Sequence, residues 1–166
     1  MLRREAGRPV EDSWVKVDDE APLPEGIAVV VSLARFERDG DLLASRNAAL
    51  GISVPSKTSP EVLAPHLDRL SLVAIQFPVS KDGRGFTIAR ALRERYGYKG
   101  EIRAIGHILP DQYVHLIRCG VDRVEVSVGT EARWQEALSF YDTAYQQALT
   151  DDRPLSLMRR RLNLPK

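Results

Sequence analysis

Among the residue patterns of this chain, the charged loop Asp82-Gly83-Arg84-Gly85 is the strongest candidate for chemistry. It follows an apolar run that is typical of a buried strand, and a predicted helix begins just after it. The first amides of a helix lack intrahelical partners and favour an anion, while Arg84 can grip a phosphate, sulfate or carboxylate in a bidentate manner. A structural explanation is equally consistent, in which Gly83 and Gly85 adopt positive φ in a tight turn and Asp82 caps the helix. The glycine spacing matches neither the dinucleotide fingerprint nor the P-loop, so it indicates neither a dinucleotide nor a nucleoside triphosphate.

A second candidate loop runs from Gly106 to Gln112 and follows the next predicted strand. His107 would lie at the carboxyl end of that strand, where its imidazole could act as an acid or a base. Pro110 and Asp111 suit the first turn of a helix, which gives them a sufficient structural explanation. The three histidines of the chain lack the spacing of metal ligands, so the sequence predicts no metal site.

Cys119 is the single cysteine of the chain, so it cannot form an internal disulfide or a dithiol couple. This usage fits a reducing compartment. We interpret Cys119 as a buried structural residue at the end of a predicted helix. Neither a Gly-x-Ser-x-Gly elbow nor a Cys-x-x-Cys pair is present in the sequence. The sequence therefore indicates no cofactor, and the catalytic residues stay unassigned.

Positive charge is concentrated in residues 81–103, which carry seven basic and three acidic side chains although the whole chain has a net charge of +1. Such a cluster can attract a small anion or an acidic partner. The alternative is a solvated helix face on which Arg90 and Glu94 form an i,i+4 pair. Nucleic acid is not expected, because the overall charge is near zero and no aromatic-interleaved basic motif occurs. The candidate anion- or partner-binding residues are Asp82, Gly83, Arg84, Gly85, Arg90, Arg93, His107, Asp111, Gln112 and Arg118.

The length of 166 residues and the hydrophobic fraction of 43% fit one domain with a continuous core. The longest apolar run, residues 27–33, is far shorter than the roughly 20 residues of a membrane span. The amino terminus lacks the apolar segment of a secretory signal, so we expect a cytoplasmic protein without a membrane segment. We divide the chain into an N-terminal lead (1–25), an α/β domain (26–150) and a basic C-terminal tail (151–166).

Strand and helix patterns alternate along the central part of the chain. Strands are predicted at residues 27–33, 72–77, 101–106 and 123–126, with a short further strand at 15–17. Helices are predicted at residues 41–51, 59–70, 86–96, 111–118 and 130–149. This alternation favours parallel pairing and an α/β fold: a single-domain, open, mostly parallel sheet with helices on both faces, flavodoxin-like or Rossmann-like. The alternative is a partial (β/α) barrel. In either case the two candidate loops should share the carboxyl edge of the sheet, where ligands bind in open α/β sheets.

The segment from residue 77 to residue 120 resembles a known family of bacterial proteins, domain-of-unknown-function family 934. The matching residues are Phe77-Pro78, Asp82-Gly83-Arg84-Gly85, Ala89-Arg90, Leu92-Arg93-Glu94-Arg95-Tyr96-Gly97, Gly100-Glu101, Arg103-Ala104, Gly106, Asp111-Gln112 and Arg118-Cys119-Gly120. The chain departs from the pattern at His107, at Pro110 and at residues 79–81. Members are described as probable oxidoreductases of sulfite reduction because of the genes that lie beside theirs.

The resemblance leads to two hypotheses of different kinds. In the first, the protein is an accessory protein of assimilatory sulfite reduction whose basic face docks sulfite reductase or its electron donor. In the second, it is an oxidoreductase or a small-oxyanion-binding enzyme that uses the loop at residues 82–85. The first is favoured because the sequence shows no dithiol, metal-ligand set, flavin fingerprint or nicotinamide fingerprint. An aromatic ridge of Trp134, Tyr141 and Tyr145 would serve a homodimer if it is exposed.

Overall fold

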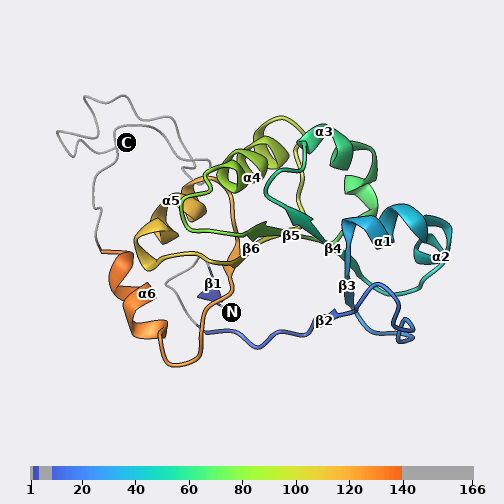
Figure 1. Ribbon diagram of the computed structural model, residues 1–166, viewed down its shortest axis with the longest axis horizontal. Helices are drawn as coiled ribbons and strands as arrows, with labels where there is room; N and C mark the ends of the chain where they lie inside the picture. Colours follow the sequence, from blue (N-terminus) through green and yellow to red (C-terminus); the bar gives the residue numbers. More distant parts are fainter. Residues whose placement is uncertain (1, 4–8, 140–166) are drawn as a thin grey trace, which may run out of the picture.

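The computed structural model describes residues 2–3 and 9–139, which form a single α/β unit built on one sheet (Figure 1). The described strands pair in the order β1-β7-β6-β5-β4-β3-β2. All neighbours from β2 to β7 are parallel, and β1 is antiparallel to β7. The strands are β1 (Leu2–Arg3), β2 (Val15–Lys16), β3 (Val29–Ser32), β4 (Leu50–Pro55), β5 (Leu72–Phe77), β6 (Glu101–Gly106) and β7 (Arg123–Val124).

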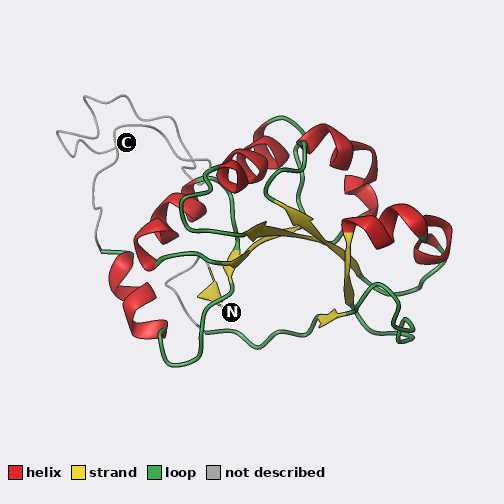
Figure 2. Ribbon diagram, viewed as in Figure 1, coloured by secondary structure: helices red, strands yellow, loops and turns green. Residues whose placement is uncertain are grey.

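Helical segments connect these strands (Figure 2). They are α1 (Leu33–Arg38), α2 (Gly40–Ala44), α3 (Pro60–Leu63), η1 (Ala64–Arg69), α4 (Arg84–Glu94), η2 (Pro110–Gln112), α5 (Tyr113–Arg118) and α6 (Glu131–Ala137), where η marks a 3₁₀ helix. None of the helices within the described residues is long and apolar enough to cross a membrane.

The parallel strands follow one another in the sheet in the same order as in the chain. Right-handed crossovers between successive neighbours place the connecting helices on one side of a sheet. Figure 1 accordingly shows the helices α1 to α5 over the same face. The predicted open parallel sheet is confirmed. Its strand order matches the alternative prediction of a partial (β/α) barrel. The described helices cover one face of the sheet, whereas the first prediction placed helices on both faces. The sheet curls into a half barrel, and we call its helix-covered side the outer face and its other side the inner face.

The main hydrophobic core lies between the outer face and the helices. Alternate residues of β5, Val73, Ile75 and Phe77, point into this core together with Leu92 of α4 and Tyr113 of α5. The other residues of the same strand point to the inner face. A smaller cluster there contains Val30, Leu72 and Ala74, against which Trp14 and Ile105 pack.

Most sequence-based boundaries agree with the structure, but the helix predicted at residues 41–51 is wrong in its second half, because α2 ends at Ala44 and β4 begins at Leu50. The strands predicted at residues 72–77 and 101–106 have the predicted limits, and the short strand near residue 15 pairs with β3. Gly97 and Gly120 have the positive φ expected at helix ends. Trp134 is buried and packs edge-on against Tyr113 with ring centroids 5.5 Å apart, so it belongs to the core and not to an exposed ridge. Tyr141, Tyr145 and the predicted basic tail lie outside the described residues.

Candidate functional site

The two candidate loops lie side by side at the carboxyl edge of the sheet, as the sequence predicts. Phe77 at the end of β5 is in register with Gly106 at the end of β6. The backbone N–H of His107 donates to the Phe77 carbonyl at 2.8 Å. Further along, the side-chain amide of Gln112 donates to the Ser80 carbonyl at 2.7 Å. These bonds hold the loop after β5 against the loop after β6.

Gly106 allows the two loops to approach each other this closely. Its φ is 99°, a conformation that residues with a side chain rarely adopt. A Cβ atom on Gly106 would lie 2.5 Å from the Phe77 carbonyl oxygen, which is far inside van der Waals contact. The turn into His107 therefore requires glycine for both its backbone angle and its proximity to β5.

Asp82 is the polar centre of the first loop and is largely buried. One carboxylate oxygen accepts hydrogen bonds from the Ser56 hydroxyl at 2.5 Å and from Arg84 Nη2 at 2.8 Å. The other accepts from Arg84 Nε at 2.9 Å and from the Arg84 backbone N–H at 3.1 Å. These donors stabilise the ionised form, so the pKa of Asp82 lies well below its usual value. Because Ser56 follows β4, Asp82 also joins the loops of two neighbouring strands.

This arrangement explains the loop differently from either sequence-based interpretation. The fork of the Arg84 guanidinium is paired with Asp82, so an oxyanion at Arg84 would have to compete with a carboxylate that is already in place. Gly83 and Gly85 do not have positive φ, and that part of the structural explanation is wrong. Gly85 is required because a Cβ atom there would lie 2.4 Å from the ring of Phe77. Asp82 bonds to the amide of Arg84, the first residue of α4.

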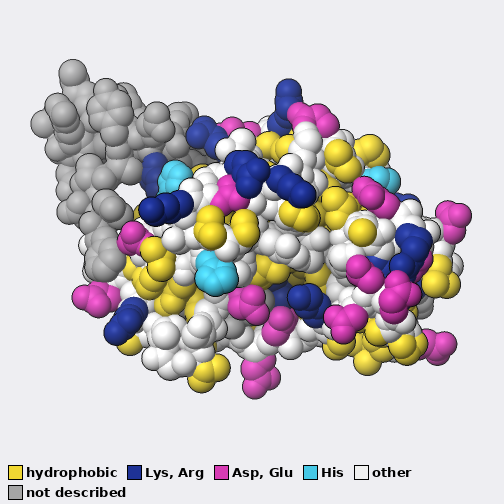
Figure 3. Space-filling model, in the orientation of Figure 1, with side chains coloured by type: hydrophobic (Ala, Val, Ile, Leu, Met, Phe, Trp, Pro, Cys, Tyr) yellow, Lys and Arg dark blue, Asp and Glu magenta, His cyan; other side chains and the backbone are white. Residues whose placement is uncertain are grey.

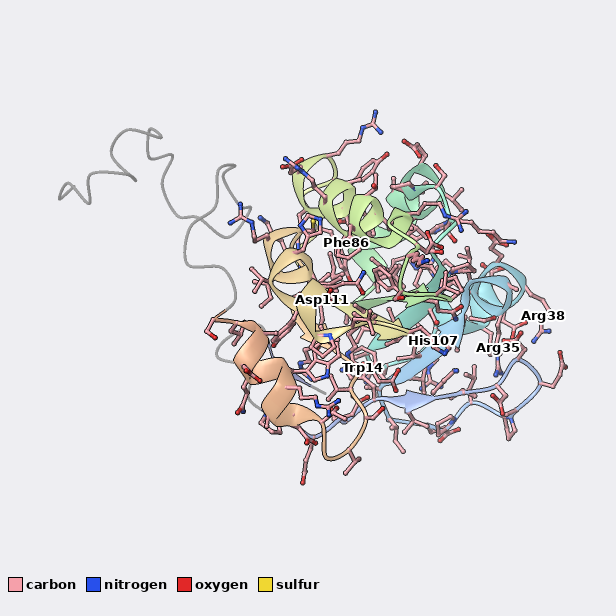
Figure 4. All side chains as sticks on the ribbon, turned by 60° about the vertical axis from the view of Figure 1, so that its left-hand side comes forward. Trp14, Arg35, Arg38, Phe86, His107 and Asp111 are labelled. Carbon is pink, nitrogen blue, oxygen red and sulfur yellow. The ribbon has the colours of Figure 1, made fainter. Side chains whose placement is uncertain are left out.

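The second loop presents polar groups to solvent next to the first. His107 and Asp111 are exposed, and Figure 4 shows both on the loop that follows β6. Gln112 fixes the loop from inside, since its side-chain oxygen accepts from the Leu109 backbone N–H at 3.0 Å while its amide reaches Ser80. Asp111 lies in the first turn of η2, where its negative charge complements the helix dipole.

The three remaining candidates, Arg90, Arg93 and Arg118, lie away from this edge. Helix α4 begins at the carboxyl edge and leads back towards the start of β6, so Arg93 is about 13 Å from Arg84 along the helix axis. Arg90 pairs with Glu94 at 2.9 Å, as the i,i+4 alternative predicts. Arg118 is the last residue of α5. The structure thus brings seven of the ten candidate residues together and leaves three on the helices.

Arg93 is a structural clamp in this arrangement. Its guanidinium donates to the carbonyls of Gly120 at 3.0 Å, Tyr98 at 2.6 Å and Gly100 at 2.9 Å, and it pairs with the Asp122 carboxylate. All of these groups lie in turns that precede β6 or β7. The bonds connect α4 to the amino-terminal edge of the sheet, opposite the candidate loops.

Cys119 is buried, which confirms the structural interpretation of its placement. Burial raises the pKa of its thiol, while the positive charges of Arg90 and Arg118 act in the opposite direction. The sulfur lies 3.9 Å from His115 Nε2. Partial burial of the imidazole and the positive charges of Arg118 and Arg90 lower the pKa of His115.

Basic side chains gather on the outer surface of the molecule over α4. Figure 3 shows Lys and Arg side chains along this side. Three arginines of this surface, Arg84, Arg90 and Arg95, have side chains that are 62%, 54% and 65% exposed. Each of them pairs with a carboxylate, namely Asp82, Glu94 or Glu61. We call the surface formed by Lys81, Arg84, Arg90, Arg95 and Lys99 the basic face.

Sequence analysis missed a group of polar residues on the inner face. Arg103 is 2% exposed in the middle of β6, and it pairs with Asp12 and Glu101. On neighbouring strands, the Gln76 side-chain amide donates to the Ser53 hydroxyl at 2.7 Å. A signal was present in the sequence, because a charged residue interrupts the apolar run from Ile102 to Ile105.

A separate cleft of about 770 Å³ lies between residues 20–26 and the segment that contains α2. Arg35 and Arg46 contribute to its lining, but none of the predicted site residues does. Each nitrogen of the Arg35 guanidinium already donates one hydrogen bond, to Asp39 and to the carbonyls of Asp18 and Ala21. In the part of the chain that the structure describes, no three His, Cys, Asp or Glu side chains converge as metal ligands do.

Fold and site together define an α/β half-barrel protein whose polar loops meet at the carboxyl edge of a parallel sheet. The model of a family described as bacterial protein of unknown function, DUF934, matches residues 51–156, and the chain belongs to this family. The match begins in β4 and includes both candidate loops. The resemblance found in the sequence is thereby confirmed at the level of the family. No curated protein matches the chain.

Proposed function

We propose that this protein is an accessory protein of assimilatory sulfite reduction that docks an acidic surface of sulfite reductase, or of its electron donor, through the basic face. The choice of pathway rests on the resemblance described above. The mode of action rests on three exposed arginines, Arg84 and Arg90 of α4 and Arg95 directly after it, and this group of charges is the observation that carries the proposal. A positive surface of this kind accelerates the encounter with an acidic partner and orients it.

The ion pairs of the basic face are compatible with docking. Exposed pairs such as Arg90–Glu94 and Arg95–Glu61 each contribute little to stability, about 0 to 1 kcal/mol. Carboxylates of a partner can therefore replace Glu94 or Glu61 at small cost. Arg84 differs, because its carboxylate partner Asp82 is buried and is held by Ser56 as well.

Charge reversal on α4 tests the proposal. The double variant Arg90→Glu/Arg95→Glu should bind purified sulfite reductase, or its donor protein, at least about tenfold more weakly than the wild type, which corresponds to about 1.4 kcal/mol. Binding is measured by surface plasmon resonance at low salt. The matched control is Arg38→Glu, which reverses a 48% exposed arginine on α1. Equal affinity of both variants and the wild type for these partners, or no binding by the wild type, would contradict the proposal.

The alternative of a small-oxyanion site at residues 82–85 receives less support from the geometry. Sulfite, sulfate or phosphate would have to separate Arg84 from a carboxylate that makes four hydrogen bonds. Isothermal titration with these three anions decides the point. Heat that disappears in Arg84→Ala would favour the alternative.

A further inference from the structure

A short segment of the chain covers the inner face of the half barrel. Residues 10–14 have no regular secondary structure and run beneath the sheet to β2, as Figure 1 shows. We call this segment the strap. Two of its side chains, Asp12 and Trp14, reach the sheet. Figure 4 shows Trp14 on the side of the sheet opposite to Phe86, which lies on α4.

Both side chains of the strap meet at Arg103. Arg103 Nη1 donates to the two carboxylate oxygens of Asp12 at 2.8 Å and 2.9 Å. The Trp14 ring lies against the same guanidinium, with its centroid 5.9 Å from the central carbon. The strap thus places a carboxylate and an aromatic ring on one buried cation.

Arg103 retains an unused donor. Its Nε pairs with Glu101, but its Nη2 is buried and has no hydrogen-bond partner among the described residues. A buried donor without a partner costs about 1–3 kcal/mol. Asp12 reaches only Nη1, although guanidinium groups commonly bind carboxylates with two nitrogen atoms. The bond to Asp12 therefore leaves this arginine incompletely satisfied.

The surface beneath the strap has the composition of a ligand site. Ser53, Ala74, Arg103 and Arg123 lie in one row across β4 to β7. Beside Arg103, the small side chain of Ala74 leaves room above the sheet. Leu72 and Val30 continue this apolar surface, which would form the floor of a site. An apolar floor with a few fixed polar groups at its margin is typical of small-molecule sites.

Charge on the inner face favours an anion once Asp12 leaves. Arg103 and Arg123 are close to two carboxylates, Asp12 and Glu101. Glu101 belongs to β6 and stays in place, whereas Asp12 belongs to the strap and its side chain is 35% exposed. Removal of Asp12 leaves one positive charge in excess on a surface that is largely buried.

We propose that Arg103 anchors a binding site for a small aromatic carboxylate, and that the strap fills this site with the Asp12 carboxylate and the Trp14 ring in place of the ligand. A free carboxylate is not tethered to the chain, so it can bind Nη1 and Nη2 together. Its ring replaces Trp14 on the floor formed by Leu72 and Ala74. The site lies on the face opposite to the basic face, so it goes beyond the docking function and is independent of it.

Phenylacetate is a suitable probe, because it carries one carboxylate and one aromatic ring. The variant Asp12→Ala/Trp14→Ala should bind it at least about tenfold more tightly than the wild type. In the wild type the strap must open before the ligand binds, and a strap that is open in at most about one molecule in ten weakens the apparent affinity at least about tenfold. Isothermal titration measures both affinities. Addition of Arg103→Met to the double variant should abolish binding. The control Glu20→Ala removes one of the two carboxylates that pair with the exposed Arg38 and should create no binding.

A second measurement uses the intact strap and covers the case in which the double variant does not fold. The chain has two tryptophans, so in Trp134→Phe the emission reports on Trp14 alone. Phenylacetate should shift this emission to the red as the ring moves into water. The proposal is overturned if a folded double variant does not bind phenylacetate, or if Arg103→Met leaves binding unchanged. It is also overturned if the emission of Trp14 stays constant up to the solubility limit of the probe.

Discussion

Asp82 connects the loops of two neighbouring strands through a single carboxylate. Ser56 approaches it from the loop after β4, and Arg84 approaches it from the start of α4. The bond to Ser56 lies between buried groups, while the Arg84 side chain is largely exposed. Asp82 therefore acts as a structural anchor from which α4 and its charged surface begin.

The first prediction concerns the pH dependence of this anchor. The pKa of Asp82 is lowered in the folded state, so the unfolded chain binds the proton more readily. The stabilisation is complete above about pH 5 and is lost as the pH falls through the acidic range. Asp82→Asn should therefore lower stability at neutral pH and make the loss of stability in acid less steep. Urea unfolding between pH 7 and pH 3 measures this effect.

The exposed residue Asp111 supplies the control for this experiment. We expect Asp111→Asn to change the pH profile less than Asp82→Asn does, because the Asp111 side chain is exposed whereas Asp82 is buried. A profile of Asp82→Asn that parallels the wild type at every pH would contradict the role assigned to Asp82.

The second prediction concerns Gly85. A Cβ atom at this position meets the Phe77 ring inside the core, so Gly85→Ala overpacks the contact and should lower the free energy of unfolding by about 1–3 kcal/mol. Gly40→Ala is the matched control, because nothing lies within 4 Å of the added atom and its φ is ordinary. Thermal unfolding compares the two variants. Equal melting temperatures would show that the ring of Phe77 moves freely aside.

At the scale of elements, α4 serves two purposes on its two sides. Its buried side packs Ile88, Ala89 and Leu92 against the sheet, and its exposed side carries Arg84 and Arg90 of the basic face. Arg93 lies between the two and fastens the end of the helix to the turns before β6 and β7. The helix is thus held at both ends, by Asp82 at its start and by Arg93 near its end.

The third prediction follows from this clamp. Arg93→Ala removes the ion pair with Asp122 and the donor to three carbonyl groups, so it should lower the free energy of unfolding by about 3 kcal/mol. The Asp122 carboxylate keeps its bond from the Ile102 backbone N–H. Arg93→Lys should recover only part of the loss, because an ammonium group cannot reproduce the fork of the guanidinium. Denaturant unfolding measures all three proteins. The control Arg90→Ala removes an exposed pair and should cost no more than about 0.5 kcal/mol.

A loss of similar size in Arg90→Ala and Arg93→Ala would contradict the clamp. Such a result would mean that α4 depends on its charge in general and not on the bonds of Arg93.

Elements with strong local signals could be predicted from the sequence. The limits of β5 and β6 follow from apolar runs bounded by turn residues, and Gly97 and Gly120 mark the ends of helices through their backbone conformation. The proximity of the two candidate loops also follows, because parallel neighbours share a carboxyl edge. These features depend on residues that are close in the sequence.

Features that depend on distant residues could not be predicted. Strand order is decided by packing over the whole chain, so the half barrel remained an alternative to a doubly wound sheet. Asp12 and Arg103 are separated by 91 positions, and no local pattern indicates that they pair. Arg84 and Arg93 look alike in the sequence, but one is exposed beside Asp82 while the other is part of a clamp at the opposite edge.

At the scale of the whole molecule, the half barrel separates two kinds of surface. The outer face is covered by helices and presents the basic face, while the inner face is small and is closed by the strap. The loops that contain Asp82 and His107 lie at the carboxyl edge of the sheet, between the outer and the inner face. A partner that docks on α4 would also lie near these loops, because α4 begins at Arg84.

The salt dependence of the interaction with sulfite reductase, or with its electron donor, tests the central claim most directly. Exposed charges are screened over about 10 Å at 0.1 M ionic strength and over about 3 Å at 1 M. Docking through the basic face therefore predicts an affinity that falls steadily as the salt concentration rises, with a smaller dependence in Arg90→Glu/Arg95→Glu. An affinity that does not change with salt, or the absence of any interaction with either protein at low salt, would contradict the account.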